Sequence, residues 1–270
     1  MLRPVTHVIT APTQLEGGGF RVRRPLPAPG GVRQVDPVLM IDEMGPVDYR
    51  PGEAVGAPDH PHRGFETVTY MLEGEFEHRD SAGHAGKLSP GDVQWMTAGR
   101  GVVHSELPSA RIMEQGGRVH GFQIWVNLPA RLKMTAPRYQ EVAAANIPEA
   151  ATLDGLARVR VVAGEALGAT ARIDTHTPIV YQHWTLQPGA VVRQPLPADH
   201  NGLLYVFSGE LQSAGTPLRD GQMGVLGAGD TVELVVPGSM ESSAQVLLLG
   251  GVPLNEPVVQ HGPFVMNTRE

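Results

Sequence analysis

The sequence predicts an all-β protein that contains two copies of one fold. Short runs of β-branched and aromatic residues, such as 67–72 (TVTYML) and 122–128 (FQIWVNL), are separated by turn residues, and the 270-residue chain has 33 glycines and 24 prolines. Runs of this length bounded by glycine and proline are typical of antiparallel sandwiches and barrels. Helix signals are few, and a short turn or helix is expected only within 141–151, as part of a connector.

Two pairs of similar segments indicate an internal duplication. Residues 68–75 (VTYMLEGE) are echoed by 203–210 (LLYVFSGE), and 89–93 (SPGDV) by 227–231 (GAGDT). The first pair resembles a strand that enters a glycine turn, and the second a Gly-Asp turn that starts the next strand. We therefore predict an N-terminal domain over 1–132, a connector over 133–150 and a C-terminal domain over 151–270.

Composition excludes several classes of protein. The N-terminal stretch MLRPVTHVITAPTQ lacks the apolar run of a signal peptide, and no apolar run approaches the ~20 residues that span a bilayer, so we expect a cytoplasmic protein that does not enter membranes. Cysteine is absent, which leaves histidine and carboxylates as the expected metal ligands. The net charge is −7 and the basic residues are scattered, which disfavours direct binding to nucleic acid.

Two segments carry most of the functional information: His60-Pro61-His62 and His104-Ser105-Glu106. Side chains two residues apart project to the same side of a strand. If the two strands are neighbours, three imidazoles and one carboxylate converge on one point. This ligand set suits a divalent transition metal, and iron, manganese, copper, nickel and zinc are all compatible with it.

The two carboxylates near these histidines allow different roles. Glu106 shares a strand face with His104, and it could bind the metal or act as a nearby base that hydrogen-bonds a ligand imidazole. We expect Glu66 to be a partner outside the ligand set, or to form a salt bridge with Arg63. Pro61 favours extended backbone and holds His60 and His62 on one side.

The second half lacks an equivalent ligand set. Alignment of the halves at Gly74 and Gly209 places two prolines opposite His60 and His62, and alignment of Gly91 with Gly229 places a serine and an alanine opposite His104 and Glu106. These four replacements are Pro195, Pro197, Ser242 and Ala244. His200 lies nearby but alone, so we predict a C-terminal domain without metal.

The remaining candidates receive less specific predictions. We expect His78 and His84 to be solvated, because they flank a polar turn, and Gly99 to Gly101 to form a turn rather than a phosphate-binding loop. Four further histidines lack a partner at strand spacing: His120, His176, His183 and His261. Four residues on predicted strands could line a cavity: Gln94, Met96, Gln123 and Trp125. For Met96 and Trp125, core packing is the preferred role.

The spacing of the two histidine segments resembles the two motifs of the cupin superfamily, whose jelly-roll barrels hold a metal. Cupins often take their carboxylate ligand from the first motif, where Glu66 stands. Longer strings resemble the pirin family more closely: residues 60–84 (HPHRGFETVTYMLEGEFEHRDSAGH), 89–106 (SPGDVQWMTAGRGVVHSE), 120–129 (HGFQIWVNLP) and 256–270 (EPVVQHGPFVMNTRE). The resemblance covers nearly the whole chain and is densest between residues 59 and 129.

The pirin resemblance implies two tandem cupin-type barrels and one metal, generally iron(II), held by His60, His62, His104 and Glu106. It also implies flavonol 2,3-dioxygenase activity, which opens the central ring of quercetin with loss of carbon monoxide and would use Glu106 as the catalytic base. A second implication is a non-catalytic, redox-responsive protein that binds a transcription regulator or a metabolic enzyme. A metal-dependent isomerase or hydrolase would need a further acid/base pair, which the sequence does not show.

Overall fold

The computed structural model describes residues 1–27 and 35–270. The chain forms two compact units, and we define the N-terminal unit as residues 12–27, 39–146 and 254–270, and the C-terminal unit as residues 1–11, 35–38 and 147–253. These units cut across the predicted linear boundaries, because the first residues of the chain belong with the second half and the last residues with the first half. Within the described residues, no helix has the length and apolar character needed to cross a bilayer.

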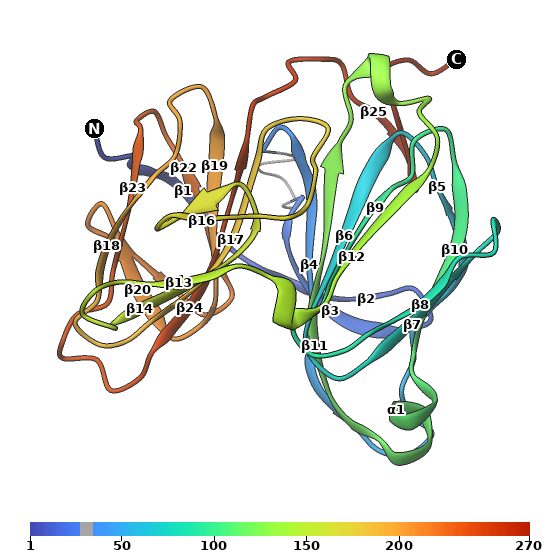
Figure 1. The fold of residues 1–270 in the computed structure, drawn as a ribbon, viewed down its shortest axis with the longest axis horizontal. Helices are drawn as coiled ribbons and strands as arrows, with labels where there is room; N and C mark the ends of the chain where they lie inside the picture. The colour runs from blue at the N-terminus through green and yellow to red at the C-terminus, as the bar shows by residue number, and fades with distance from the viewer. Residues whose placement is uncertain (28–34) are drawn as a thin grey trace. The chain divides into compact units, whose positions relative to one another are not determined.

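The N-terminal unit contains two antiparallel sheets (Figure 1). The larger sheet consists of β2 (Thr13–Glu16), β3 (Phe20–Leu26), β4 (Val38–Tyr49), β6 (Phe65–Glu73), β9 (Val93–Thr97), β11 (Gly117–Asn127) and β12 (Arg138–Val142). The smaller sheet consists of β5 (Ala57–His62), β7 (Phe76–Asp80), β8 (Ala85–Leu88) and β10 (Val102–Pro108). Their strand orders are β12-β9-β6-β11-β4-β3-β2 and β5-β10-β7-β8.

The C-terminal unit repeats this arrangement. Its larger sheet consists of β1 (Val5–Thr10), β13 (Glu149–Ala151), β14 (Ala157–Ala163), β17 (Ile179–Leu186), β19 (Asn201–Ser208), β22 (Gln222–Leu226) and β24 (Ala244–Gly251). Its smaller sheet consists of β18 (Val191–Pro195), β20 (Glu210–Ser213), β21 (Thr216–Arg219) and β23 (Thr231–Val235). The orders are β1-β22-β19-β24-β17-β14-β13 and β18-β23-β20-β21, which match those of the N-terminal unit strand for strand. The predicted duplication is confirmed.

The remaining elements are short. They are the hairpins β15 (Glu165–Ala166) with β16 (Ala169–Thr170) and β25 (Val259–His261) with β26 (Phe264–Met266), the helix α1 (Ala110–Gln115), and the 3₁₀ turns η1 (Ala130–Leu132) and η2 (Ala144–Asn146). The Ser109 hydroxyl caps α1 by accepting a hydrogen bond from the backbone N–H of Ile112. The turn η2 lies within 141–151, where a short turn or helix was predicted.

The register of the two copies differs from the sequence alignment. The backbone N–H of Gly91 donates to the carbonyl of Met71 at the end of β6, and the N–H of Gly221 donates to the carbonyl of Val206 at the matching place in β19, both at 2.8 Å. Gly91 therefore corresponds to Gly221. The predicted alignment of Gly91 with Gly229 is wrong, because Gly229 precedes β23 whereas Gly91 precedes β9.

The corrected register changes the residues that replace the histidines. Val102 pairs with His62 in the N-terminal unit, and Val232 pairs with Gln194 in the C-terminal unit, so Gln194 stands in the place of His62. Two residues earlier on the same strand, the place of His60 is taken by Val192. The prolines 195 and 197 do not occupy these places.

On the partner strand, Leu234 and Val236 take the places of His104 and Glu106, instead of the serine and alanine at 242 and 244. Val192, Leu234 and Val236 are all buried in the apolar core of the C-terminal unit. Among the described residues, the group of possible metal ligands lies in the N-terminal unit. Aliphatic side chains thus fill three of the four places in the C-terminal unit, and the buried amide of Gln194 fills the fourth.

The C-terminal tail completes the N-terminal unit. The carbonyl of Arg63 accepts a hydrogen bond from Val265, and Val265 packs into a buried cluster with Leu39 and Phe65. The buried ammonium of Lys133 donates to the carbonyls of Gly64 and Val265, at 2.7 and 3.0 Å. It also donates to Asn127 Oδ1 at 2.7 Å, while its burial lowers the pKa of Lys133 to about 8.

We expect Lys133→Met to destabilise this attachment by about 2 kcal/mol, because three buried acceptors lose a charged donor. The urea midpoint should fall, and hydrogen exchange of the segment 259–266 should accelerate. The matched control is Arg131→Met, since Arg131 is an exposed cation in the neighbouring turn. Equal midpoints and equal exchange in the two variants would contradict a stabilising role for Lys133.

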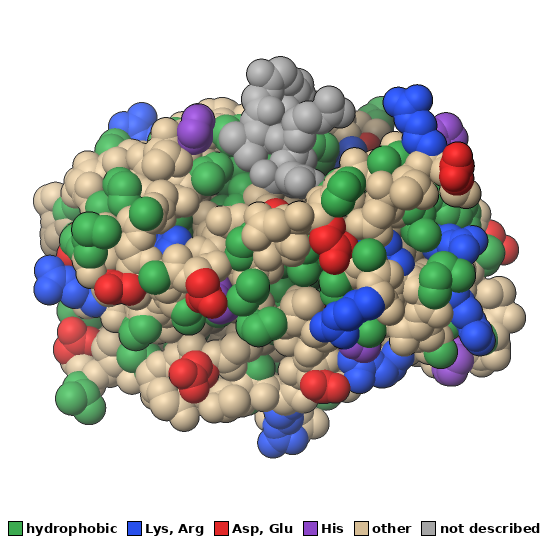
Figure 2. All heavy atoms as spheres, turned by 90° about the horizontal axis from the view of Figure 1, so that it is seen from above, with side chains coloured by type: hydrophobic (Ala, Val, Ile, Leu, Met, Phe, Trp, Pro, Cys, Tyr) green, Lys and Arg blue, Asp and Glu red, His purple; other side chains and the backbone are tan. Residues whose placement is uncertain are grey.

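The surface agrees with the scattered charges of the sequence. On the face shown in Figure 2, basic side chains are interspersed with acidic ones and do not gather into a basic patch.

Candidate metal centre

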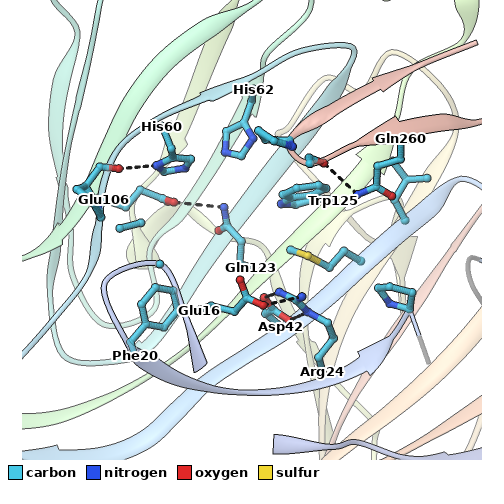
Figure 3. A pocket seen from close by; sticks show the side chains of 18 of the residues that line it. Glu16, Phe20, Arg24, Asp42, His60, His62, Glu106, Gln123, Trp125 and Gln260 are labelled. Carbon is cyan, nitrogen blue, oxygen red and sulfur yellow. Dashed lines mark hydrogen bonds and ion pairs between the residues drawn. The ribbon is translucent and has the colours of Figure 1, made fainter. Parts of the chain in front are cut away.

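Three histidines converge at the pairing of β5 with β10. His104 lies directly opposite His60, and Val102 lies opposite His62. Because His60 and His62 are two residues apart on one strand, all three imidazoles project to the same side. Their ligand atoms lie within 4.8 Å of one another (Figure 3). The predicted convergence of the two histidine segments is confirmed for these three side chains.

The three rings are closely packed. The ring centroid of His60 lies 4.6 Å from that of His62 and 4.5 Å from that of His104. The centroids of His62 and His104 are 5.0 Å apart. His62 and His104 are almost fully buried, at 3% and 1% exposure. Neither ring nitrogen of these two residues has a hydrogen-bond partner in the described part of the chain. Unsatisfied buried polar atoms are costly, and a metal ion would satisfy one nitrogen on each ring.

The protonation states also suit a metal. Burial lowers the pKa of His62 to about 2, with further contributions from His104 and His60. Burial likewise lowers the pKa of His104. Neutral imidazole is the form that binds a metal ion. His60 Nδ1 lies 2.7 Å from the carbonyl of Pro58, so Nδ1–H donates there and Nε2 keeps its lone pair for a ligand.

Glu106 lies beside the histidine group, but its carboxylate is not among the ligand atoms that lie within 4.8 Å of one another. Its Oε1 is 2.9 Å from the hydroxyl of Thr69, and its Oε2 is 3.4 Å from Nε2 of Gln123. The same Thr69 hydroxyl is 2.6 Å from Gln123 Oε1, so its single proton serves one acceptor at a time. These contacts hold the carboxylate at the cavity wall, where both of the roles predicted for it stay open.

Glu66 occupies a different environment. It is buried at 1% exposure on β6 and accepts a hydrogen bond of 2.7 Å from the hydroxyl of Thr97. It does not line the cavity that His60, His62 and Glu106 share. Glu66 therefore lies outside the histidine group. The two roles expected for it, as a partner of the ligand set or of Arg63, stay predictions.

His60 and His62 open onto a cavity of about 510 Å³ within the N-terminal unit. Gln123 and Trp125 line it, and the Trp125 ring lies 5.4 Å from that of His62 (Figure 3). The preferred prediction of core packing for Trp125 is wrong in part, because its indole is also a cavity wall. Met96 is fully buried in the core, as predicted, and Gln94 donates to Glu141 instead of lining the cavity.

Sequence reasoning missed a group of three charged residues at the cavity. The Arg24 guanidinium forms a bidentate pair with Asp42 and a second pair with Glu16, at 2.7 Å. All three line the cavity. The sequence signal for this group was a pair of basic residues at 23–24 and a pair of acidic residues at 42–43. The two pairs lie opposite each other where β3 pairs with β4.

The other histidines have local roles. His78 was predicted to be solvated, and this is wrong: it is 3% exposed, lies 2.6 Å from Glu141 Oε1 and stacks on Tyr139. His84 is exposed, as predicted. His120 forms a hydrogen bond with Glu43, and His183 forms one with Gln245. His176 is half-buried and His261 is exposed.

Comparison with known proteins explains this architecture. A family model described as Pirin matches residues 19–126, and one described as Pirin C-terminal cupin domain matches residues 181–270. The chain belongs to the pirin family. Similar pirins include a pirin-like protein of Solanum lycopersicum (45% identical over 99% of this chain and 88% of that protein) and one of Caulobacter vibrioides (44%, covering 100% and 94%). Human pirin is 42% identical over 99% of this chain and 89% of its own.

Two solved structures place this pirin-family chain among two-domain cupins. A quercetin 2,3-dioxygenase from Acinetobacter baumannii is 35% identical, with a TM-score of 0.92 over 100% of this chain and 93% of that one. The bacterial pirin YhhW from Escherichia coli, in complex with nickel(II), is 20% identical, with a TM-score of 0.70 over 92% and 99%. The second likeness concerns the fold alone.

We expect one metal ion per chain, bound through the three converging histidines. His62→Ala and His104→Ala should each lose most of it, because removal of one imidazole leaves an incomplete ligand set. Elemental analysis after loading and dialysis measures this, with the exposed His84→Ala as the control. Full metal content in both variants would show that other residues hold the ion.

Proposed function

We propose that this member of the pirin family is a metal-dependent dioxygenase that cleaves flavonols such as quercetin, with iron(II) as its metal. The observation that supports it is the convergence of three histidines, two of which line a cavity that Glu106 also lines. The similarity to the Acinetobacter baumannii quercetin 2,3-dioxygenase supports the same substrate class. We assign His60, His62 and His104 as the ligands that anchor the ion, with Glu106 adjacent as base or fourth ligand.

A bound iron(II) ion would supply open coordination positions for a flavonol oxygen and for dioxygen. The chain provides the orientation of the ligands. Burial keeps His62 and His104 neutral, and the Pro58 carbonyl fixes the ring of His60 so that Nε2 faces the group. The walls formed by Phe20, Leu39 and Trp125 suit a flat aromatic molecule.

We assign Glu106 as the group that takes the proton of the flavonol 3-hydroxyl, which makes the substrate electron-rich enough to react with dioxygen. Glu106 Oε1 is held by Thr69, whereas the contact of Oε2 within the described residues is the 3.4 Å one with Gln123. Oε2 is therefore the atom best placed to accept a proton.

We expect the iron-loaded protein to consume one dioxygen and release one carbon monoxide for each quercetin cleaved. Replacement of iron by zinc should abolish turnover without unfolding the protein, because zinc accepts similar ligands but has no redox chemistry. The measurement follows flavonol absorbance, dioxygen and carbon monoxide together. Loss of flavonol without carbon monoxide would indicate autoxidation. No reaction of fully loaded protein with any flavonol would favour the redox-responsive regulatory protein.

We expect Glu106→Gln to lower kcat for quercetin by at least about a hundredfold, because glutamine keeps the size of the side chain but cannot take the proton. Glu66→Gln should have a much smaller effect, since it removes a carboxylate outside the cavity. Steady-state kinetics at matched iron content compare the two variants. An active Glu106→Gln beside an inactive Glu66→Gln would reverse the assignment.

A further inference from the structure

The cavity has a second polar region, remote from the histidines. Glu16, Arg24 and Asp42 lie together at the end opposite His60 and His62, and Gln123 lies between the two regions (Figure 3). Arg24 is held by both oxygens of Asp42, so its guanidinium is fixed in place. The region is brought into the cavity by three strands, β2, β3 and β4, of the larger sheet.

Glu16 offers this cavity an acceptor with unused capacity. Its Oε1 accepts hydrogen bonds from Gln14 Nε2 at 2.6 Å and from Arg24 at 2.7 Å. Within the described residues, no group donates to Oε2 of Glu16, and its side chain is 34% exposed. A carboxylate oxygen of this kind accepts strong hydrogen bonds from hydroxyl groups.

The charge of the lining restricts what can bind. Arg24 is the one basic side chain among the described lining residues that is not histidine, and it is already paired with two carboxylates. Two further carboxylates, Asp59 and Glu106, line the same space. The formal charge of these five groups is −3, and the divalent ion proposed at the histidines would change it to −1. At the end of the cavity remote from that ion, the lining would repel an anionic group and favour a neutral group rich in hydrogen-bond donors.

Independent observations mark the cavity as a ligand site. His62 lines it with both ring nitrogens buried and without a hydrogen-bond partner in the described chain. Phe20 and Trp125 provide aromatic walls of the same cavity. A flat molecule with polar groups at two ends therefore matches the distribution of the lining.

We propose that Glu16, oriented by Arg24, is the specificity-determining acceptor for a phenolic hydroxyl of a flat, uncharged aromatic ligand whose other end lies at the histidines. This inference rests on the proposed function for the identity of the ligand class. Glu16 selects hydroxylated rings over unsubstituted ones, and together with Asp42 it selects against ligands that carry a carboxylate. Asp42 acts through Arg24 and is a positioning residue.

The test measures binding to the full-length, zinc-loaded protein, which separates recognition from oxygen chemistry. Quercetin, which has hydroxyl groups on both outer rings, is compared with 3-hydroxyflavone, which has none there, by quenching of tryptophan fluorescence. We expect the wild type to prefer quercetin, and Glu16→Ala to reduce that preference roughly tenfold, as befits the loss of a charged hydrogen bond. A flavone carboxylic acid should bind weakly to the wild type and more tightly to Glu16→Ala.

The matched control is Glu114→Gln, an exposed carboxylate on α1 outside the cavity, which should leave the preference unchanged. If Glu16→Ala does not fold, Glu16→Gln keeps the size of the side chain and should lower the preference in the same direction. An unchanged preference in folded Glu16 variants, or no flavonol binding by the wild type, overturns this inference. Failure of the proposed function is a different result: flavonol binds with the expected preference, but the iron-loaded protein releases no carbon monoxide.

Discussion

The antiparallel pairing of β5 with β10 is the constraint on which the candidate site depends. His104 faces His60 across this pair, and His62 follows on the same side. A slip of one residue in this register would turn every side chain of the slipped strand to its other face and separate the imidazoles. The backbone hydrogen bonds of the sheet thus bring together two buried imidazoles that lack hydrogen-bond partners among the described residues. Unsatisfied buried polar groups are costly, and the sheet holds these two in an arrangement that could bind a metal ion.

The cavity around the histidines is assembled from distant parts of the chain. The β2–β3 hairpin supplies Glu16 and Phe20, and the C-terminal hairpin supplies Gln260 and Pro263. Lys133 fastens this tail through backbone carbonyls. The chemistry of the site and the shape of the cavity therefore have separate structural origins, so that ligand preference can change without loss of the histidine group.

The two units illustrate two ways to fill the same interior. Where the N-terminal unit has His60 and His104, the C-terminal unit has Val192 and Leu234 within a continuous apolar core. Buried imidazoles need partners, whereas aliphatic side chains gain free energy from burial alone. At the matching places, the second copy is stabilised by apolar burial and needs no ion.

Much of this organisation could be predicted from the sequence, because it depends on local pattern. Alternation along a strand determined that His60 and His62 share a face, and punctuation by glycine and proline determined the all-β class. The repeated strand-and-glycine pattern at Gly74 and Gly209 determined the duplication. These features follow from backbone geometry over a few residues, which a single sequence displays directly.

Only the tertiary structure decided the features that depend on register and on long-range contacts. Similar Gly-Asp turns made Gly229 look equivalent to Gly91, although strand pairing assigns that place to Gly221. A polar turn made His78 look solvated, although Glu141 on β12 covers it. The contact of Arg24 with Glu16 and Asp42 joins three strands, and the charges at 23–24 and 42–43 do not by themselves specify that these strands are neighbours. Spacing specifies which side of a strand a residue faces, but only the packed sheets specify what lies opposite.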